Sequence, residues 1–203
     1  MSGQRLDPQG LAAVAALVPP GSRVLDLGCG DGALLARLIG ERGCSGSGVE
    51  IDEAAILACV SRGLSVVHGD LEQGLSEHGD QSVDVVILNQ SVQQLRQVDK
   101  VLQDALRVGR RVLVGFPNFA HWSVRAQVCL LGRTPVTPGL PWQWYETPNL
   151  HFFSLKDFEA WCARRGVRVL AKVPLDRGHR CRLWPNLMAR DGVYLVEMFA
   201  REG

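Results

Sequence analysis

A short stretch of the chain combines carboxylates and glycines in a pattern that suits ligand binding. It reads Asp26-Leu27-Gly28-Cys29-Gly30-Asp31-Gly32, and it lies between an apolar run and a helix-like stretch that starts near Ala33. Glycines in such a turn permit positive φ and let a ligand approach the backbone closely. The stretch therefore predicts a ligand-binding turn between a strand and a helix.

Two ligand classes fit the spacing of this turn. Gly28-x-Gly30-x-x-Ala33 satisfies the dinucleotide fingerprint, with Glu50 near the ribose-binding position about 20 residues further on. Asp26 and Asp31 disfavour NAD, because a pyrophosphate would meet two carboxylates, each costing about 1 kcal/mol at ~4 Å in water. S-adenosylmethionine carries a sulfonium and an ammonium and suits these acids. We therefore expect S-adenosylmethionine or S-adenosylhomocysteine; the alternative is that both aspartates only cap the following helix.

Two further acids follow neighbouring apolar runs. Glu50 ends the second expected strand, where it can accept hydrogen bonds from ribose hydroxyls, and Asp70 follows the third, where it can reach an adenine edge. Acids at strand ends are also often merely solvated, which is the alternative for Glu50. With the cationic ligand, each acid near the turn has a role.

The surrounding pattern predicts the elements that position these groups. Short apolar runs alternate with helix-like stretches from residue 22 to 115, which indicates a mostly parallel sheet built from βαβ units. Expected strands are Arg23 to Leu27, Ser45 to Glu50, Leu64 to His68, Val83 to Leu88 and Arg111 to Phe116. Expected helices are a short one capped by Asp7, Ala33 to Glu41, Glu53 to Arg62 and Val98 to Arg107. The strands do not alternate in polarity, so we expect helices on both faces of the sheet.

The second part of the chain differs in composition. All 13 aromatic residues lie at or after Phe116, and residues 116–203 carry 12 basic and 7 acidic side chains, against 10 and 14 in residues 1–115. Five prolines between residues 117 and 150 predict a long connection, a lid or partner segment. A helix from Ser154 to Arg165, with Ser154 as its expected N-cap, and strands Val167 to Pro174 and Val193 to Ala200 follow. We expect one domain over residues 1–203.

Other classes of protein are disfavoured. The six cysteines form no C-x-x-C pair and have no histidine at metal-ligand spacing, so we expect no metal site. No apolar run approaches the roughly 20 residues of a membrane span. The net charge of +1 and the lack of a nucleic-acid signature disfavour RNA or DNA binding. We expect a soluble, cytoplasmic protein.

The turn and its acids resemble the class I S-adenosylmethionine-dependent methyltransferases, whose D-x-G-x-G-x-G signature spans Asp26 to Gly32. The resemblance implies a Rossmann-like α/β fold, with a seven-stranded, mostly parallel sheet whose last strand, Val193 to Ala200, inserts antiparallel. It implies that Ile51 packs on the adenine ring with Leu71 beside it. The cofactor-binding residues implied are Asp26, Gly28, Cys29, Gly30, Gly32, Glu50, Ile51, Asp70, Leu71 and Asn89.

From about Ser22 onward the chain also resembles the MetW family of methionine biosynthesis. The resemblance rests on Gly-Val-Glu-Ile-Asp (48–52), His-Gly-Asp-Leu-Glu-Gln-Gly-Leu (68–75), Phe-Pro-Asn-Phe-Ala-His-Trp (116–122), Gly-Arg-Thr-Pro-Val-Thr (132–137) and Leu-Pro-Trp-Gln-Trp-Tyr-Glu-Thr-Pro-Asn-Leu-His-Phe-Phe (140–153). After the fourth strand this chain has Asn89-Gln90-Ser91-Val92-Gln93, where such proteins usually have Ser-Gln-Thr-Leu-Gln. The departure lies at the sulfonium end of the expected pocket.

The family resemblance implies a partner, the homoserine O-acyltransferase usually called MetX. It suggests an accessory or regulatory protein that binds S-adenosylmethionine or S-adenosylhomocysteine. The alternative is an active methyltransferase on a small-molecule acceptor, since methyl transfer requires mainly positioning and at most one base. His121, Tyr145 and His151 are the candidate catalytic residues in that case. The alternative, which we favour for any single one of them, is that Tyr145 packs the long connection onto the sheet and that each histidine is a hydrogen-bonded loop residue.

Overall fold

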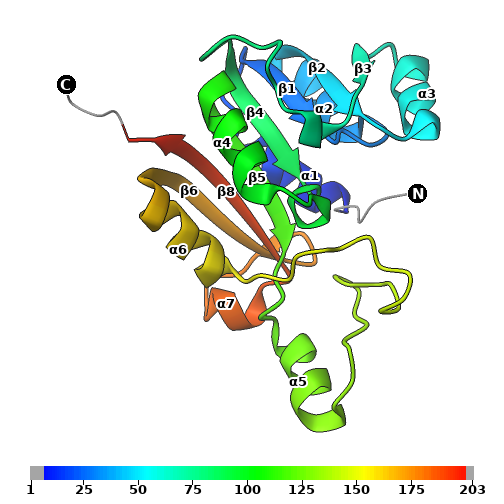
Figure 1. Ribbon diagram of the computed structural model, residues 1–203, viewed down its shortest axis with the longest axis vertical. Helices are drawn as coiled ribbons and strands as arrows, with labels where there is room; N and C mark the ends of the chain where they lie inside the picture. The colour runs from blue at the N-terminus through cyan, green and yellow to red at the C-terminus, as the bar shows by residue number, and fades with distance from the viewer. Residues whose placement is uncertain (1–6, 200–203) are drawn as a thin grey trace.

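A single sheet organises the computed structural model, which describes residues 7–199. Within these residues eight strands run in the order β3-β2-β1-β4-β5-β8-β6-β7 (Figure 1). The strands are β1 (Arg23–Leu27), β2 (Ser45–Glu50), β3 (Val66–His68), β4 (Val83–Asn89), β5 (Gly109–Pro117), β6 (Val167–Asp176), β7 (His179–Arg180) and β8 (Asp191–Met198). Strands β1 to β5 pair in parallel, as the alternating pattern predicts, and β8 inserts antiparallel between β5 and β6, as the resemblance implies.

The strand count differs from the expected seven in the described residues. The additional strand, β7, is only two residues long and pairs antiparallel with the end of β6. Arg177 and Gly178 join the two strands with φ values of 47° and 76°. Such a pair of positive φ angles gives a tight hairpin turn. The extra strand is therefore a local hairpin that leaves the order of the other seven unchanged.

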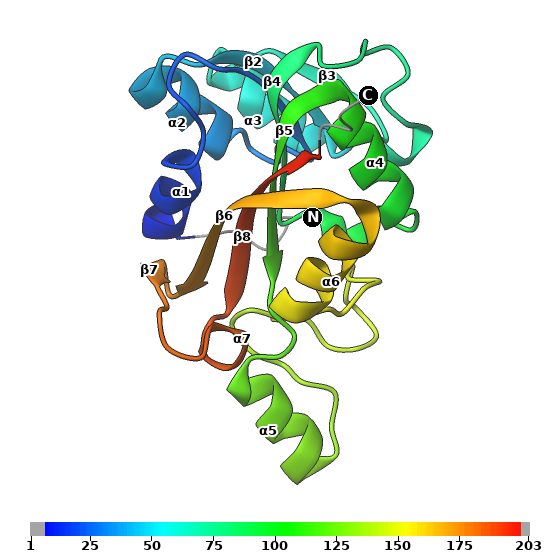
Figure 2. The ribbon, with the colours of Figure 1, turned by 90° about the vertical axis from the view of Figure 1, so that its left-hand side faces the viewer.

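Helices cover both faces of the sheet, as the strand composition predicts. Figure 2 shows α1 and α2 on one side of the sheet and α4 and α6 on the other. The helices are α1 (Pro8–Ala15), α2 (Ala33–Arg42), α3 (Glu53–Ser61), α4 (Val98–Val108), α5 (Trp122–Leu131), α6 (Leu155–Arg165) and α7 (Pro185–Met188), with short 3-10 turns η1 (Leu71–Gln73) and η2 (Val92–Gln94). The caps are those expected, because Asp7 accepts from Gly10 N at 2.6 Å and Ser154 forms a capping box with Asp157.

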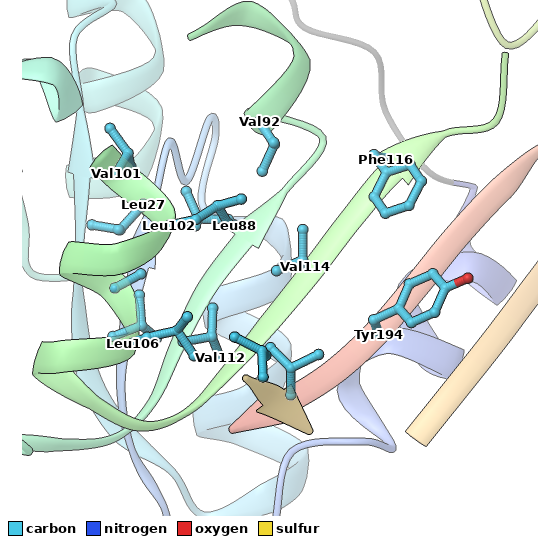
Figure 3. Packing of buried hydrophobic residues seen from close by; sticks show 14 of the residues in the cluster. Leu27, Leu88, Val92, Val101, Leu102, Leu106, Val112, Val114, Phe116 and Tyr194 are labelled. Carbon is cyan, nitrogen blue, oxygen red and sulfur yellow. The ribbon is translucent and has the colours of Figure 1, made fainter. Parts of the chain in front are cut away.

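Aliphatic and aromatic side chains divide the core between them. Figure 3 shows the aliphatic part, in which β1, β4 and β5 pack against α4: Leu27, Leu88, Val112, Val114, Val101, Leu102 and Leu106. Toward β8 and α6 the same cluster becomes aromatic. The rings of Phe116 and Tyr194 stack with centroids 5.7 Å apart, and Phe158 lies 5.1 Å from Phe116. Part of the late aromatic content of the chain thus belongs to the strands and helix that close the sheet.

The segment from residue 117 to 150 contains a helix that the sequence analysis does not predict. Helix α5 is capped by His121, whose side chain accepts from Ser123 N, and ends at Gly132 with φ of 59°. Val124 is its single buried residue, while the apolar Val128 and Leu131, one and two turns further along the same side, are exposed, so α5 packs little of its surface on the core. In both views α5 projects away from the sheet (Figures 1 and 2). Among residues 7–199, no helix is long and apolar enough to cross a membrane.

Candidate functional site

The glycine turn connects β1 to α2 at the carboxyl edge of the sheet. Gly28, Gly30 and Gly32 have φ values of 74°, 56° and 75°, a region that other residues rarely adopt. The N–H of Gly28 donates to the carbonyl of Val49 at 2.8 Å, which ties the turn to β2. A Cβ on Gly28 would lie 3.0 Å from the Cβ of Ser91. The turn therefore requires glycine for its conformation at three positions and for space at Gly28 and Gly32, where a Cβ would overlap the Cδ1 of Leu64.

The carboxylate of Glu50 holds the turn from the end of β2. It accepts from Gly30 N at 2.8 Å, from Ile51 N at 2.8 Å and from Asp52 N at 3.0 Å. Three backbone donors thus share one acid, which links the glycine turn to the start of α3. Glu50, which the sequence predicts to bind ribose, therefore also stabilises the conformation of the glycine turn.

Asp26 lies in β1 beneath the turn and is 2 % exposed. Burial, and secondarily the charge of Glu50, raises the pKa of Asp26 from 3.8 to about 7. Near neutral pH a substantial fraction of this carboxyl is therefore protonated. A cationic ligand beside it would favour the ionised form, because opposite charges stabilise each other in a poorly solvated site.

Asp31 has a different environment from Asp26. Its carboxylate forms an ion pair with Arg62 at 3.1 Å and accepts weakly from Ala33 N, the first residue of α2, at 3.3 Å. The helix-capping alternative thus describes Asp31. Much of its charge is balanced by Arg62, so Asp26 and Glu50 are the acids that would mainly oppose an anionic pyrophosphate at the turn.

Cys29 turns its side chain away from the open side of the turn. Its Sγ lies 3.9 Å from the Sγ of Cys59 on α3, and a Cβ on Gly48 would overlap it. Burial and the carboxyl of Asp26 raise the pKa of the Cys29 thiol, so the thiol stays protonated. Cys29 therefore packs the turn onto β2 and α3, and it can offer a ligand only its backbone.

The remaining predicted cofactor residues lie around the same edge. Ile51 is 59 % exposed, and the exposed Asp70 caps η1 by accepting from Glu72 N at 2.9 Å. Leu71 approaches Gly28, with its Cδ1 3.8 Å from the position of a Gly28 Cβ. Asn89 ends β4 and lies over Gly115 of β5. Strand ends β1, β2 and β4 and turn η1 thus converge on one edge, where ligands bind in open α/β sheets.

Ser91 is a site residue that the sequence analysis does not select. Its Oγ donates to the carbonyl of Leu27 at 3.1 Å, and its Cβ lies against Gly28. The contact joins residues 64 positions apart. In the sequence it is marked only by its place in the stretch Asn89-Gln90-Ser91-Val92-Gln93 that follows the fourth expected strand.

The three candidate catalytic residues occupy separate environments. His121 is buried as the cap of α5, with Nδ1 2.8 Å from Ser123 Oγ, and burial together with nearby Arg190 lowers its pKa. Tyr145 is 66 % exposed and stands edge-on to Trp144, and His151 is exposed. His121 borders a small cavity of about 10 Å³ that Asn118 and Arg190 also line. The arrangement does not assemble them into one catalytic group.

A doubly wound sheet with an acidic glycine turn after β1 and an antiparallel β8 is the fold of the class I S-adenosylmethionine-dependent methyltransferases. Two solved structures share it. A possible histamine N-methyltransferase from Thermotoga maritima is 18 % identical, with a TM-score of 0.66 over 93 % of this chain and 87 % of that one. A methyltransferase from Geobacter sulfurreducens in complex with S-adenosyl-L-homocysteine is 23 % identical, with a TM-score of 0.57 over 88 % and 71 %.

The sequence identifies the family within this class. The chain matches the family described as "Methionine biosynthesis protein MetW" over residues 9–196 and belongs to it. A relative from Rhodopirellula baltica, the "Bifunctional methionine biosynthesis protein MetXA/MetW", is 35 % identical over 179 residues. The match covers 83 % of this chain but 29 % of that relative, so the chain spans less than a third of its length.

Proposed function

We propose that the protein binds S-adenosylmethionine or S-adenosylhomocysteine at the glycine turn. The observation that carries this proposal is the pair Asp26 and Glu50, two acids at the end of adjacent parallel strands beside positive-φ glycines. The pair favours a cationic ligand over a pyrophosphate. Glu50, Ile51, Asp70 and Leu71 would surround the adenosine, and Gly28 with Asn89 would face the amino-acid and sulfonium end. The bound homocysteine derivative in the Geobacter sulfurreducens structure supports the ligand class through the shared fold.

The proposed role is that of an accessory partner of a homoserine O-acyltransferase in methionine biosynthesis. The Rhodopirellula baltica relative supports it, because its name joins MetXA and MetW in one polypeptide. Fusion keeps two units together at high effective concentration, which is useful when they must associate. S-adenosylmethionine is made from methionine, so a protein of this family that binds it is suited to report the level of the end product.

The surface proposed for docking is the segment 117–150, which we call the docking segment. It carries large apolar side chains that are exposed to solvent: Trp122, Val128, Leu130, Leu131, Trp144 and Tyr145. A cluster of exposed aromatic and aliphatic residues is typical of a protein interaction site, and Trp and Tyr often dominate the binding free energy. Its base is held firmly, because Asn118 Nδ2 donates to Asn186 O at 3.1 Å and to Ala189 O at 2.8 Å.

Two measurements test the proposed function. Calorimetry with S-adenosylmethionine, S-adenosylhomocysteine and NAD should give binding of the first two; tight binding of NAD alone would overturn the ligand assignment. Co-purification with the homoserine O-acyltransferase, and assays of its activity with and without this protein, should give a complex and a changed rate. Labelled methyl transfer to a small molecule, abolished by Asp26→Asn, would instead favour an active methyltransferase.

A further inference from the structure

The 3-10 turn η2 touches the ligand turn at one end. Ser91, the residue directly before η2, places its Cβ 3.0 Å from the position of a Gly28 Cβ and donates its Oγ to Leu27 O at 3.1 Å. A ligand that approaches the backbone of Gly28 therefore meets Ser91. Val92, the first residue of η2, is completely buried in the core (Figure 3). Because Val92 is packed in the core, a displacement of Ser91 must shift η2 as well.

The other end of η2 holds the end of the docking segment. The carbonyl of Gln93 accepts from Leu150 N at 2.9 Å and from His151 N at 3.0 Å. The Gln93 side chain is 1 % exposed and donates from Nε2 to Gln90 O at 2.9 Å, which fixes the turn that presents this carbonyl. One buried residue thus separates the contact with the ligand turn from the contact with residues 150 and 151.

The segment 149–153 also contacts the residues that precede α5. Phe119 N donates to Phe153 O at 3.1 Å, and Asn118 N donates to Arg190 O at 2.6 Å. Residues 149–153 therefore run between η2 and the residues that precede α5. A change in how firmly they are held at Gln93 acts directly on the position of the docking segment.

Two features oppose this contact. Gln90 has a φ of 61°, which is costly for a residue other than glycine. Within residues 7–199, four buried amide atoms here lack a hydrogen-bond partner: Gln90 Oε1, Gln93 Oε1, Asn149 Nδ2 and Asn149 Oδ1. These unpaired atoms oppose the arrangement in which Gln93 binds residues 150 and 151. A ligand contact that stabilises this arrangement therefore shifts its population.

We infer that η2 couples the two sites: ligand bound at Gly28 packs on Ser91, steadies η2, and so strengthens the hold of Gln93 on residues 150 and 151. Gln93 is in this role a positioning residue for the docking segment. The inference rests on the proposed function and deepens it, since it specifies how occupancy of the ligand site reaches the partner surface. Coupling between two sites is reciprocal. A change that weakens the contact of residues 149–151 with Gln93 must therefore lower the affinity for the ligand by the coupling factor.

Amide hydrogen exchange on the unmodified protein gives the first test. Saturating S-adenosylhomocysteine should slow exchange at Leu150 and His151 by roughly 2- to 12-fold, the range that corresponds to the net stability of one hydrogen bond. Helix α6, which begins at Leu155, serves as the internal reference and should change less. If calorimetry shows binding and exchange at these two amides is unaltered, the coupling is absent. If no binding occurs, the proposed function fails and the coupling fails with it.

A pair of variants at one position gives the second test. Leu150→Pro removes the N–H that donates to Gln93, and Leu150→Ala keeps it while removing the same exposed side chain. The proline variant should bind S-adenosylhomocysteine roughly 2- to 12-fold more weakly than the alanine variant. Circular dichroism should show that both are folded. Equal affinities would overturn the inference, and the exchange experiment stands independently if the proline variant does not fold.

Discussion

The carboxylate of Glu50 accepts a hydrogen bond from the backbone N–H of Gly30 at 2.8 Å. This contact spans from the end of β2 to the middle of the glycine turn, across 20 positions of the sequence. The same carboxylate accepts from two further N–H groups at the start of α3. Glu50 therefore stabilises the conformation of the glycine turn.

Glu50→Gln is expected to weaken S-adenosylhomocysteine binding. Hydrogen bonds to a charged acceptor contribute roughly 1.5–3 kcal/mol, so the affinity should fall about 10- to 150-fold in calorimetry. The control is Glu53→Gln, which neutralises an exposed acid in the first turn of α3. Similar affinities for the two variants would show that Glu50 serves the turn alone and contributes nothing to the ligand.

The buried Asp26 should make folding stability depend on pH. Its pKa is raised from 3.8 to about 7, so between these values the folded protein holds a proton that the unfolded chain has lost. The contribution is fully present below pH 3.8 and is lost as the pH rises through about 7. Asp26→Asn should stabilise the protein more at pH 8 than at pH 4, by at most about 4 kcal/mol. Urea unfolding at both values measures this difference; an equal gain at both would contradict it.

Ligand binding should show the opposite trend with pH. A cationic ligand favours the ionised form of Asp26, so S-adenosylmethionine should bind more tightly as the pH rises toward about 7 and then level off. Well below that value the limiting slope is about tenfold per pH unit. Calorimetry between pH 5.5 and about 8 checks the profile. Asp26→Asn should flatten it, and an unaltered profile in that variant would assign the titration to another group.

Gly28→Ala, compared with a control glycine, distinguishes the steric effect of an added methyl group from the cost of a positive φ. The new Cβ would meet Ser91 at 3.0 Å, and the φ of 74° is unfavourable for alanine. Gly43→Ala is the matched control, because its φ is 63° and no heavy atom lies within 4 Å of the new Cβ. Gly43→Ala should lose about 1–2 kcal/mol of stability in thermal unfolding, and Gly28→Ala should lose more, because its new Cβ also meets Ser91.

Only Gly28→Ala should also lose ligand affinity, by roughly tenfold or more, because the added methyl group fills the approach to the backbone. Adding Ser91→Gly relieves the contact with Ser91 and should recover part of the stability. Equal ligand affinity for the Gly28 and Gly43 variants would place the ligand elsewhere.

A charge on the docking segment should disrupt the complex with the acyltransferase. Leu130 on α5 is 80 % exposed, so Leu130→Glu should leave the fold intact while placing a carboxylate in the interface. Leu57→Glu makes the same change on α3, where Leu57 is 67 % exposed. Pull-down should show lost association for the first variant and normal association for the second. A complex that tolerates Leu130→Glu would move the interface away from α5.

Local sequence patterns were enough to predict much of the structure around the glycine turn. The bounds of β1 and β2 match those predicted, and the caps at Asp7 and Ser154 are in place. These features depend on neighbours in the chain: a glycine turn, a carboxylate or hydroxyl before a helix, an unbroken apolar run. Even the meeting of Asp26 and Glu50 follows from two strands of a parallel sheet ending at one edge.

Other features exist only in the folded molecule. Helix α5 buries a single residue, so packing on the core does not define it, and the structure places His121 at its N-cap. Ser91 reaches Gly28, and Gln93 holds Leu150, through contacts between residues distant in the chain.

The sequence by itself determined the ligand turn and the elements that flank it, because short-range sterics and hydrogen bonding specify them. The tertiary structure alone decided which acid forms an ion pair, which loop contacts the glycine turn and which apolar side chains are exposed to solvent. Those outcomes depend on packing across the sheet, which no local pattern encodes.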